Sequence, residues 1–383
     1  MDQKTARYVK NFAHAHHAEA LELLKVLARI PAPSHHEERR AEFVRNWMHA
    51  ARMTDAFIDD ATSVICPIQD DGTSDLVVFA AHTDVVFPDT DELPLVERDG
   101  RLYAPGVGDD TANLVILLLA ARHLAQHPEL LPSGLGMLVV ANSCEEGLGN
   151  LKGTRALFER FGTRIKRYYS LDLYLPGIVS TAVGSHRWQI TVQTQGGHSF
   201  RDFGRPNAIE RLCALIGELY SMQLPDGIPT TINVGTVEGG TTINAIAAKA
   251  SCLFEYRSTS DEVMQDLRSQ MMQVLARYRT DEVEVTATEV GARPASVGTR
   301  SLELESMTQV SCDIVRTITG EEPNDAPSST DANIPLSLGI PANTVGAVRG
   351  ALLHTRDEWV DMASVEEGLA VALGLMLAQN RLD

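Results

Sequence analysis

Residues 75–84 read DLVVFAAHTD, and this stretch decides the fold. Its continuous apolar run, Leu76 to Ala81, is typical of a strand that is buried on both faces, as in a parallel or mixed sheet. A second run of this kind, GMLVVAN, covers 136–142, and a third, RYYSLDLY, covers 167–174. An apolar helix is predicted between the first two, at 114–126. This alternation of strands and helices predicts an α/β protein.

The pattern of the sequence changes near residue 184. The segment WQITVQTQ at 188–195 alternates apolar and polar residues, which is typical of a sheet with one solvent-exposed face. The elements predicted there are strands at 188–195, 231–240, 248–258 and 282–290, and helices at 207–222 and 260–278. Their order, β-α-β-β-α-β, is that of a small ferredoxin-like sandwich. We therefore expect a small α+β domain at 183–295, inserted into a larger α/β domain formed by 1–182 and 296–383.

Composition excludes several classes of protein. The chain of 383 residues has 33 basic and 51 acidic side chains and a net charge of −18, which argues against nucleic-acid binding and against docking on anionic membranes. Its longest apolar run, Leu114 to Ala121, is too short to span a bilayer, which takes about 20 residues. The N-terminal stretch has no apolar region typical of a signal peptide. Five scattered cysteines without a CxxC pair are typical of a reduced protein, so we expect a cytoplasmic location.

The segment before the second helix has a capping signal. A first helix is predicted at 6–30, and Pro31 and Pro33 end it. Ser34 stands three residues before Glu37, the spacing of a capping box at the start of the next helix.

Acids and histidines follow the buried strands, where open α/β sheets build their sites. His82 and Asp84 come directly after the first strand, and residues two apart in extended backbone point to the same side. A metal-bound histidine needs a carboxylate at its second nitrogen, so His82 could be a ligand with Asp84 as its orienting partner. A buried histidine satisfied by a neighbouring aspartate explains the pair equally well.

Two further segments carry paired acids. GVGDDTAN at 106–113 places Asp109 and Asp110 just before the apolar helix, and an N-cap role accounts for one aspartate but not for both. SCEEG at 143–147 places Glu145 and Glu146 at a strand end, where they repel each other unless a cation or a proton neutralises one of them. One glutamate could bind a metal while the other serves as general base, and a solvated loop is the alternative.

Three single residues complete the set. Asp172, expected inside the third strand, needs a partner there. His354 follows a strand and a glycine near the C-terminus. Cys144 as a nucleophile is disfavoured, because no histidine partner is evident and two adjacent acids would raise its pKa.

Together these residues predict a site for two metal ions. Mixed sets of histidines and carboxylates suit Zn²⁺, Mn²⁺ or Co²⁺. Two divalent ions bring +4, Asp109, Glu146 and Asp172 bring −3, and a bridging hydroxide brings −1, so the sum of zero makes burial tolerable. Glu145 is then left as the base that deprotonates the bridging water.

The chain resembles the family of di-zinc exopeptidases and deacylases, which includes peptidase T, glutamate carboxypeptidase, carnosine-type dipeptidases, aminoacylase, acetylornithine deacetylase and succinyl-diaminopimelate desuccinylase. The resemblance covers nearly the whole chain. Its motifs are LLKVLARIPAPSHHEE (23–38), HTDVV (82–86), GVGDDT (106–111), EEGLGNLKG (145–153), SLD (170–172), GGHS (196–199), TTINAIAAKASCLFEYR (241–257), STDAN (329–333), GIPANTVG (339–346) and LLHTRDEWV (352–360).

The resemblance implies a zinc-exopeptidase-type catalytic domain, with a central mixed sheet flanked by helices, and a lid and dimerisation domain at 183–295. It implies that Glu145 is the general base and that Asp84 orients a ligand. The implied ligands of two divalent metal ions, with zinc expected and manganese or cobalt as alternatives, are His82, Asp109 as the bridge, Glu146, Asp172 and His354.

The resemblance also implies roles in the inserted domain. His198 would stabilise the oxyanion, in its own site or in that of a partner subunit, and Asn244 and Arg257 would contact substrate. Alternatively, His198 simply finishes a strand, and Arg257 pairs with Glu255 or Asp261. A homodimer through the lid domain is expected.

Two positions depart from the family pattern and bear on the substrate. Many members have Lys-Gly where this chain has Thr111-Ala112, which leaves the subfamily open. In the family, aspartate at the position of Asp172 is commoner in aminopeptidases and dipeptidases, and glutamate in carboxypeptidases and deacylases. We therefore expect an aminopeptidase of the peptidase T kind that cleaves a terminal amide of short peptides. The alternatives are a deacylase of N-acyl amino acids, a carboxypeptidase, or a binding scaffold without catalysis.

Overall fold

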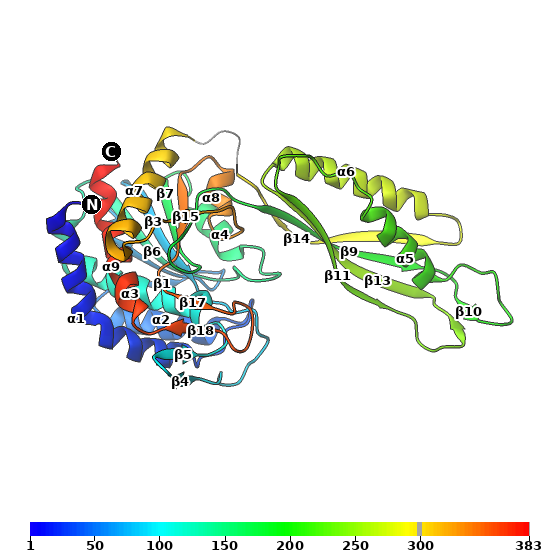
Figure 1. Cartoon of the computed structure of the whole chain (residues 1–383), viewed down its shortest axis with the longest axis horizontal. Coiled ribbons are helices and arrows are strands. Elements are labelled where there is room, and N and C mark those ends of the chain that lie inside the picture. The colour runs from blue at the N-terminus through cyan, green and yellow to red at the C-terminus, as the bar shows by residue number, and fades with distance from the viewer. Residues whose placement is uncertain (297–300, 383) are drawn as a thin grey trace. The chain divides into compact units, whose positions relative to one another are not determined.

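The computed structural model describes residues 1–296 and 301–382, and it divides into two compact units (Figure 1). One unit comprises Met1–Ala182 with Thr299–Asp383, and the other comprises Val183–Gly298. The predicted return to the larger domain at 296 adjoins 297–300, which lie outside the described residues. None of the helices in the described ranges is both long and apolar enough to cross a membrane.

A mixed sheet forms the centre of the first unit, as predicted. Its strand order is β1-β2-β6-β3-β7-β16-β8-β15, and β6, β3, β7 and β16 run parallel to their neighbours in this group. Every residue of β3 after Asp75 and of β6 after Leu135 is buried, which is why both runs are continuously apolar. The strands are β1 (Phe57–Ile58), β2 (Val64–Ile68), β3 (Asp75–His82), β6 (Leu135–Asn142), β7 (Ile165–Leu171), β8 (Gly177–Val179), β15 (Asn324–Asp325) and β16 (Ala342–Val345).

Helices cover both faces of this sheet (Figure 1). Alternate residues of β3 belong to different cores: Phe79 packs with α1, α2, α3, α7 and α9, and Val78 lies in the core that contains α4 and α8. The helices are α1 (Gln3–Leu27), α2 (Glu38–Ala50), α3 (Asn113–Gln126), α4 (Lys152–Phe161), α7 (Leu302–Thr319), α8 (Asn333–Ser337) and α9 (Ser364–Leu377). A small antiparallel sheet joins β4 (Val96–Arg98), β5 (Arg101–Tyr103), β17 (Gly350–Ala351) and β18 (Trp359–Asp361).

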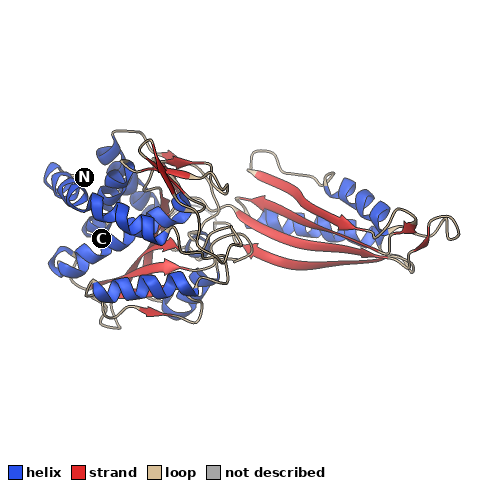
Figure 2. Cartoon of the chain, turned by 90° about the horizontal axis from the view of Figure 1, so that it is seen from below, coloured by secondary structure: helices blue, strands red, loops and turns tan. Residues whose placement is uncertain are grey.

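The second unit is an antiparallel sheet with two long helices packed on it (Figure 2). The elements follow in the expected β-α-β-β-α-β order, and the strand order in the sheet is β11-β13-β9-β14. They are β9 (Gly184–Gln193), α5 (Ala208–Leu219), β11 (Thr230–Gly239), β13 (Lys249–Ser258), α6 (Asp261–Tyr278) and β14 (Glu284–Arg293). A separate two-stranded ribbon pairs β10 (Gly197–His198) with β12 (Ala245–Ile246). Strand β11 lies at an edge of its sheet.

The predicted capping box between Ser34 and Glu37 is wrong. Helix α2 begins at Glu38, and both side chains make tertiary contacts instead of capping it. Ser34 Oγ donates to Asp84 Oδ2 at 2.7 Å, and Glu37 Oε1 accepts from the Cys144 main-chain N–H at 2.9 Å. Local spacing cannot reveal this, because both partners lie far away in the sequence.

Candidate metal centre

The carboxyl ends of three parallel strands bring several of the predicted site residues to one edge of the sheet. His82 is the last residue of β3, and Glu145 and Glu146 follow the end of β6. Asp172 comes directly after β7, so its predicted position inside a strand is wrong by one residue. The edge position explains why a buried aspartate is tolerated there: it faces the other members of the cluster.

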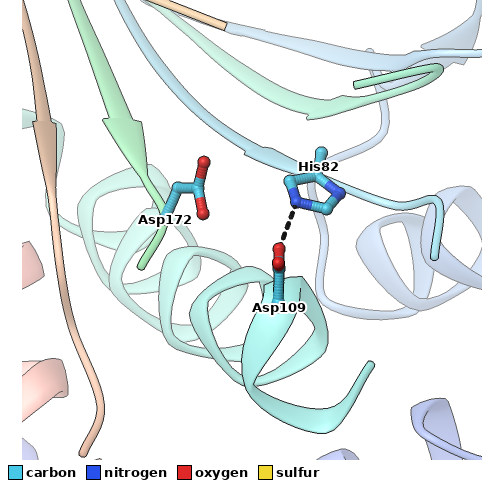
Figure 3. A group of neighbouring side chains, drawn as sticks. All are labelled: His82, Asp109 and Asp172. Carbon is cyan, nitrogen blue, oxygen red and sulfur yellow. Dashed lines mark hydrogen bonds and ion pairs between the residues drawn. The ribbon is translucent and has the colours of Figure 1, made fainter. Parts of the chain in front are cut away.

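Within the described ranges, three sets of side chains have ligand atoms that lie within 4.8 Å of one another. Figure 3 shows one of them, in which Asp172 and Asp109 point toward His82. Asp109 belongs to two of the sets. The sets are His82–Asp109–Asp172, His82–Glu145–Glu146 and Asp109–Glu146–His354, and they contain every predicted ligand together with Glu145.

The two oxygens of Asp109 face different histidines. Oδ1 lies 2.8 Å from His82 Nε2, and Oδ2 lies 3.1 Å from His354 Nε2. His354 Nε2 also lies 3.3 Å from Glu146 Oε1. A carboxylate between two ligand groups in this way is arranged as a metal bridge requires.

Asp110 has a different task from its neighbour Asp109. Both lie in the turn Val107–Ala112 before α3, whose N-cap is Ala112, so the N-cap alternative for these aspartates is wrong. Asp110 Oδ2 accepts from the His82 main-chain N–H at 2.8 Å, and its Oδ1 accepts from Asn113 Nδ2 at 2.7 Å. Asp110 therefore holds the backbone of His82 in place.

Asp84 contacts His82 and the glutamate pair. His82 Nδ1 lies 3.0 Å from the Asp84 carbonyl oxygen, which can only accept, so Nδ1 donates and Nε2 is left to face the cluster. The Asp84 carboxylate lies 3.4 Å from the same nitrogen. Its two oxygens accept from the main-chain N–H groups of Glu145 and Glu146, each at 2.9 Å. Asp84 thus fixes the histidine and the loop after β6 together.

Two buried glutamates at the site were not predicted. Glu358 accepts hydrogen bonds from the main-chain N–H groups of the 106–109 turn, and Glu37 accepts from Cys144. Both are 1% exposed. Each lies inside a quoted motif, HHEE or HTRDEWV, but an acid whose partner is a main-chain N–H has no signature in the sequence.

The structure supplies a histidine partner for Cys144 that the sequence did not reveal. Cys144 Sγ lies 3.4 Å from His35 Nδ1 and donates to Glu37 Oε1 at 3.2 Å. Burial, with the Glu37 charge, raises the pKa of the Cys144 thiol to about 12. The thiol stays protonated at neutral pH, so the nucleophile hypothesis remains disfavoured.

The site contains more carboxylates than basic side chains, and this excess of negative charge raises the pKa values of several of its groups. Burial, aided by the Asp109 charge, raises the pKa of Asp172 to about 7. Hydrogen bonds to Asp109 and Glu146 raise the pKa of His354 to about 10. Although burial opposes the charge, the surrounding acids hold the pKa of His82 well above its usual range. Nitrogen and oxygen donors with this unmet need for positive charge fit divalent cations such as Zn²⁺, Mn²⁺ or Co²⁺.

The predicted residues of the inserted domain fall into two places within the second unit. His198 is exposed on β10, where its Nδ1 accepts from the Phe200 main-chain N–H at 3.2 Å. His198 pairs with Ala245 of β12. Asn244 precedes Ala245, and its main-chain carbonyl accepts from the Ser199 N–H at 3.0 Å. The β10–β12 ribbon thus brings His198 and Asn244 together.

Arg257 lies apart from that pair. Arg257 is near the end of β13, where it pairs with Ser185 of β9. The same strand begins at Lys249, which comes shortly after the end of β12 in the sequence. At about 3.3 Å per residue, those two strand positions are roughly 26 Å apart. Arg257 Nε lies 3.1 Å from Glu255 Oε1, which is one of the two ion pairs expected as alternatives to substrate binding.

Comparison with known proteins gives one family match. The profile described as "Peptidase family M20/M25/M40" matches residues 78–378. The chain is 27% identical over 226 residues to the succinyl-diaminopimelate desuccinylase of Bordetella parapertussis, a match that covers 53% of the chain and spans only 58% of that protein. It is 23% identical over 361 residues to the protein of the same name from Corynebacterium glutamicum, covering 91% of the chain and 94% of that protein.

A solved structure has a similar fold over almost the whole chain. The aminopeptidase PepT from Bacillus cereus ATCC 10987 superposes with a TM-score of 0.71 at 21% identity, covering 95% of this chain and 99% of that one. At this identity the likeness establishes the fold: a central mixed sheet flanked by helices.

Proposed function

Because the chain belongs to Peptidase family M20/M25/M40, as its motifs suggested, we propose that it is a two-metal hydrolase that removes the N-terminal residue of short peptides. The observation that carries the proposal is the Asp109 carboxylate, which lies between His82 and His354 with Glu145 and Glu146 beside it. Aspartate rather than glutamate at position 172 favours an aminopeptidase over a deacylase.

The donor set divides into two metal positions. His82 and Asp172 would hold one ion, Glu146 and His354 the other, and Asp109 would bridge them. When bound, divalent ions polarise a scissile carbonyl and lower the pKa of a water molecule. Zinc is the proposed metal, with manganese or cobalt as alternatives.

Glu145 does the proton transfer in this proposal. It shares a set with His82 and Glu146, and Asp84 holds its main-chain N–H. Its carboxylate takes a proton from the attacking water and delivers it to the leaving amine. His198 stabilises the oxyanion, and Asn244, beside it on the β10–β12 ribbon, contacts the substrate. A substrate contact by Arg257 is not supported by its distance from the ribbon or by its pairing with Glu255.

Replacing Glu145 by glutamine tests the role of base. We expect kcat to fall by about 10²–10⁴-fold, because general-base catalysis is worth that much, while bound metal stays constant. Glu159→Gln, on the exposed face of α4, is the matched control and should leave both unchanged. Substantial turnover by a metal-replete Glu145→Gln protein would contradict the assignment.

A substrate panel tests the reaction itself. Metal-free protein is supplied with Zn²⁺, Mn²⁺ or Co²⁺ and assayed on tripeptides, dipeptides, C-terminally blocked peptides and N-acetyl and N-succinyl amino acids. Metal-dependent release of the N-terminal residue, including from C-terminally blocked peptides, is the expected result. Activity only on acylated amines would favour the second candidate, a deacylase, which the names of the two relatives support.

We propose that the protein forms a homodimer through the second unit. Strand β11 is an edge strand, and an unpaired edge is a template for another chain. Val237 on this strand is 54% exposed. We expect Val237→Lys to shift a sedimenting dimer to monomer, whereas Val96→Lys, at a 55% exposed position of the first unit, should not. An unchanged dimer in Val237→Lys would contradict this interface.

Co-expression tests whether His198 serves a partner's site. Glu145→Gln and His198→Ala subunits should each be inactive on their own, but their heterodimer would hold one complete site if His198 acts across the dimer. Purified heterodimers should then regain about half of the wild-type activity, since one of two sites is restored. Inactive heterodimers would mean that His198 acts within its own chain.

A further inference from the structure

We propose that Glu358 is a positioning residue for Asp109, and that it acts by holding the main chain of the 106–109 turn rather than by binding metal. The inference rests on the proposed function, in which Asp109 bridges two ions. Glu358 Oε2 accepts from the Gly106 N–H at 2.9 Å, and Oε1 accepts from the N–H groups of Gly108 and Asp109 at 2.9 and 2.8 Å. Tyr174 Oη donates to Oε1 at 3.1 Å.

The turn is shaped around this carboxylate. Neighbouring main-chain N–H groups that point inward form a nest for an anion, and here the anion is a side chain of the same protein. Gly106 has a φ of 70°, a left-handed conformation that favours glycine. A Cβ at Gly108 would come within 2.6 Å of Tyr174 Oη and 2.9 Å of Glu358 Oε1. Gly108 is therefore needed for the carboxylate to approach the backbone this closely.

The environment of Glu358 points to a role in the site. Its side chain is 1% exposed, and the described partners of its carboxylate are main-chain N–H groups and a phenol, not a basic side chain. Burying a carboxylate without a cationic partner is costly unless its hydrogen bonds are complete. Both of its oxygens accept hydrogen bonds, and it belongs to none of the described sets of potential metal ligands, whereas both oxygens of Asp109 face histidines.

The anchor fixes Asp109 before a metal ion arrives. The Asp109 N–H donates to Glu358 Oε1 at 2.8 Å. Glu358 comes shortly after His354 in the sequence, so it links the proposed bridge, Asp109, to the segment that carries another proposed ligand, His354. Groups behind a metal ligand typically change metal affinity 10–100-fold when removed, because the ligand then has to be ordered during binding.

The test compares full-length variants stripped of metal. For Glu358→Gln we expect the Kd for Co²⁺, measured by calorimetry, to rise about 10–100-fold, because the amide cannot accept from all three N–H groups. The visible spectrum of bound Co²⁺ should change, and kcat should fall with little change in KM. Glu358→Asp, which keeps the charge, should recover part of the affinity.

Two controls separate positioning from general stability. Glu367 lies on α9 and pairs with Arg349, so Glu367→Gln removes a carboxylate away from the turn, and the variant should bind Co²⁺ as the wild type does. Tyr174→Phe removes one donor but leaves the N–H nest, so its Kd should stay within about 3-fold.

Two results would overturn the proposal. One is a Glu358→Gln protein that melts at lower temperature but keeps the wild-type Co²⁺ affinity, spectrum and kcat, which would make Glu358 merely structural. The other is a loss of affinity in Glu367→Gln equal to that in Glu358→Gln. If the wild type itself bound no Co²⁺, the proposed function would fail together with this inference; a wild type that binds Co²⁺ but fails the substrate panel would leave the inference standing and the proposed reaction contradicted.

Discussion

Asp109 and Asp110 are neighbours in the chain, yet their carboxylates face different kinds of partner. The oxygens of Asp109 meet two histidine nitrogens, and an oxygen of Asp110 accepts the main-chain N–H of His82. Glu146 faces a histidine as Asp109 does, whereas Asp84, Glu37 and Glu358, like Asp110, hold main-chain N–H groups. Asp172 does both, since it lies in a set with His82 and Asp109 and its Oδ1 accepts from the Leu173 N–H at 2.5 Å. Residue identity alone does not distinguish the two groups, which we call ligand-facing and amide-facing carboxylates.

At the residue scale, this charge arrangement predicts how metal-free protein responds to pH. Folding raises the pKa of Asp172 from near 4 to about 7, so it destabilises the protein increasingly as pH rises through that window. Folding also raises the pKa of His354 to about 10, and the stability it contributes below about pH 6.5 is lost as pH rises. The pKa of Asp84 is lowered, so its contribution to stability is fully present above about pH 4 and changes little between pH 5 and pH 8.

We therefore expect the metal-free protein to melt at a lower temperature at pH 8 than at pH 5. Metal binding favours deprotonated ligands, so the gain in Tm on adding Zn²⁺ should grow over the same range. Differential scanning fluorimetry with and without chelator measures both. High salt is the control, because it screens the repulsion of the net charge of −18 on the surface more than the buried cluster. A metal-free Tm that rises from pH 5 to pH 8 would contradict the arrangement.

At the scale of elements, α2 connects the end of α1 with the site through one buried side chain. Arg40 is fully buried, and its guanidinium donates to Ile30 O at 2.5 Å, Thr83 O at 2.7 Å and Thr111 Oγ1 at 3.3 Å. Burial lowers its pKa to about 10, so it stays charged at neutral pH. Thr83 lies between His82 and Asp84, which ties α2 to the strand end that carries His82.

Removing this connection should cost stability. We expect Arg40→Met to lower the free energy of unfolding by about 3 kcal/mol, because buried carbonyl groups lose their donors. Urea denaturation followed by circular dichroism measures the change. Arg39→Met is the matched control on the same helix, since Arg39 is exposed and donates to Thr90 O at the surface, and it should stay within about 0.5 kcal/mol. Equal effects of the two substitutions would show that the burial of Arg40 is unimportant.

The sequence predicted elements better than it predicted the contacts between them. Continuous apolar runs predicted β3 and β6 closely, because burial on both faces leaves a direct mark on composition. Motif resemblance named the residues that the fold brings together around Asp109. It missed Glu37 and Glu358, and the Ser34 spacing was misleading, because hydrogen bonds to distant main-chain groups depend on tertiary structure alone.

At the scale of the whole molecule, the second unit is built to be separable. Its sheet and helices share a core of their own. The chain enters on β9 and leaves on β14, and these neighbouring strands pair Ser185 with Arg293. Neighbouring strands lie about 4.8 Å apart, so the two crossings are close together in space.

This geometry predicts that the second unit can be excised. Joining Ala182 to Ser301 by a short Gly-Ser linker should leave a first unit that folds and binds Co²⁺, since its cores and proposed ligands lie outside 183–300. It should have no turnover, because His198 is gone. Circular dichroism, calorimetry and the peptide assay check these outcomes. Peptide turnover by the shortened chain would contradict the role proposed for His198, and loss of folding would show that the units depend on each other.

The amide-facing carboxylates should slow the hydrogen exchange of the main-chain amides that they hold. The main-chain N–H groups of His82, Gly106, Gly108, Asp109, Cys144, Glu145 and Glu146 are all bonded to side-chain carboxylates. Most of these residues lie in loops, where amide hydrogens ordinarily exchange with solvent deuterium quickly. Here they should exchange as slowly as strand amides, with or without metal. Reloading a stripped protein then requires no refolding of the loops, and its rate is set by how fast ions reach the site.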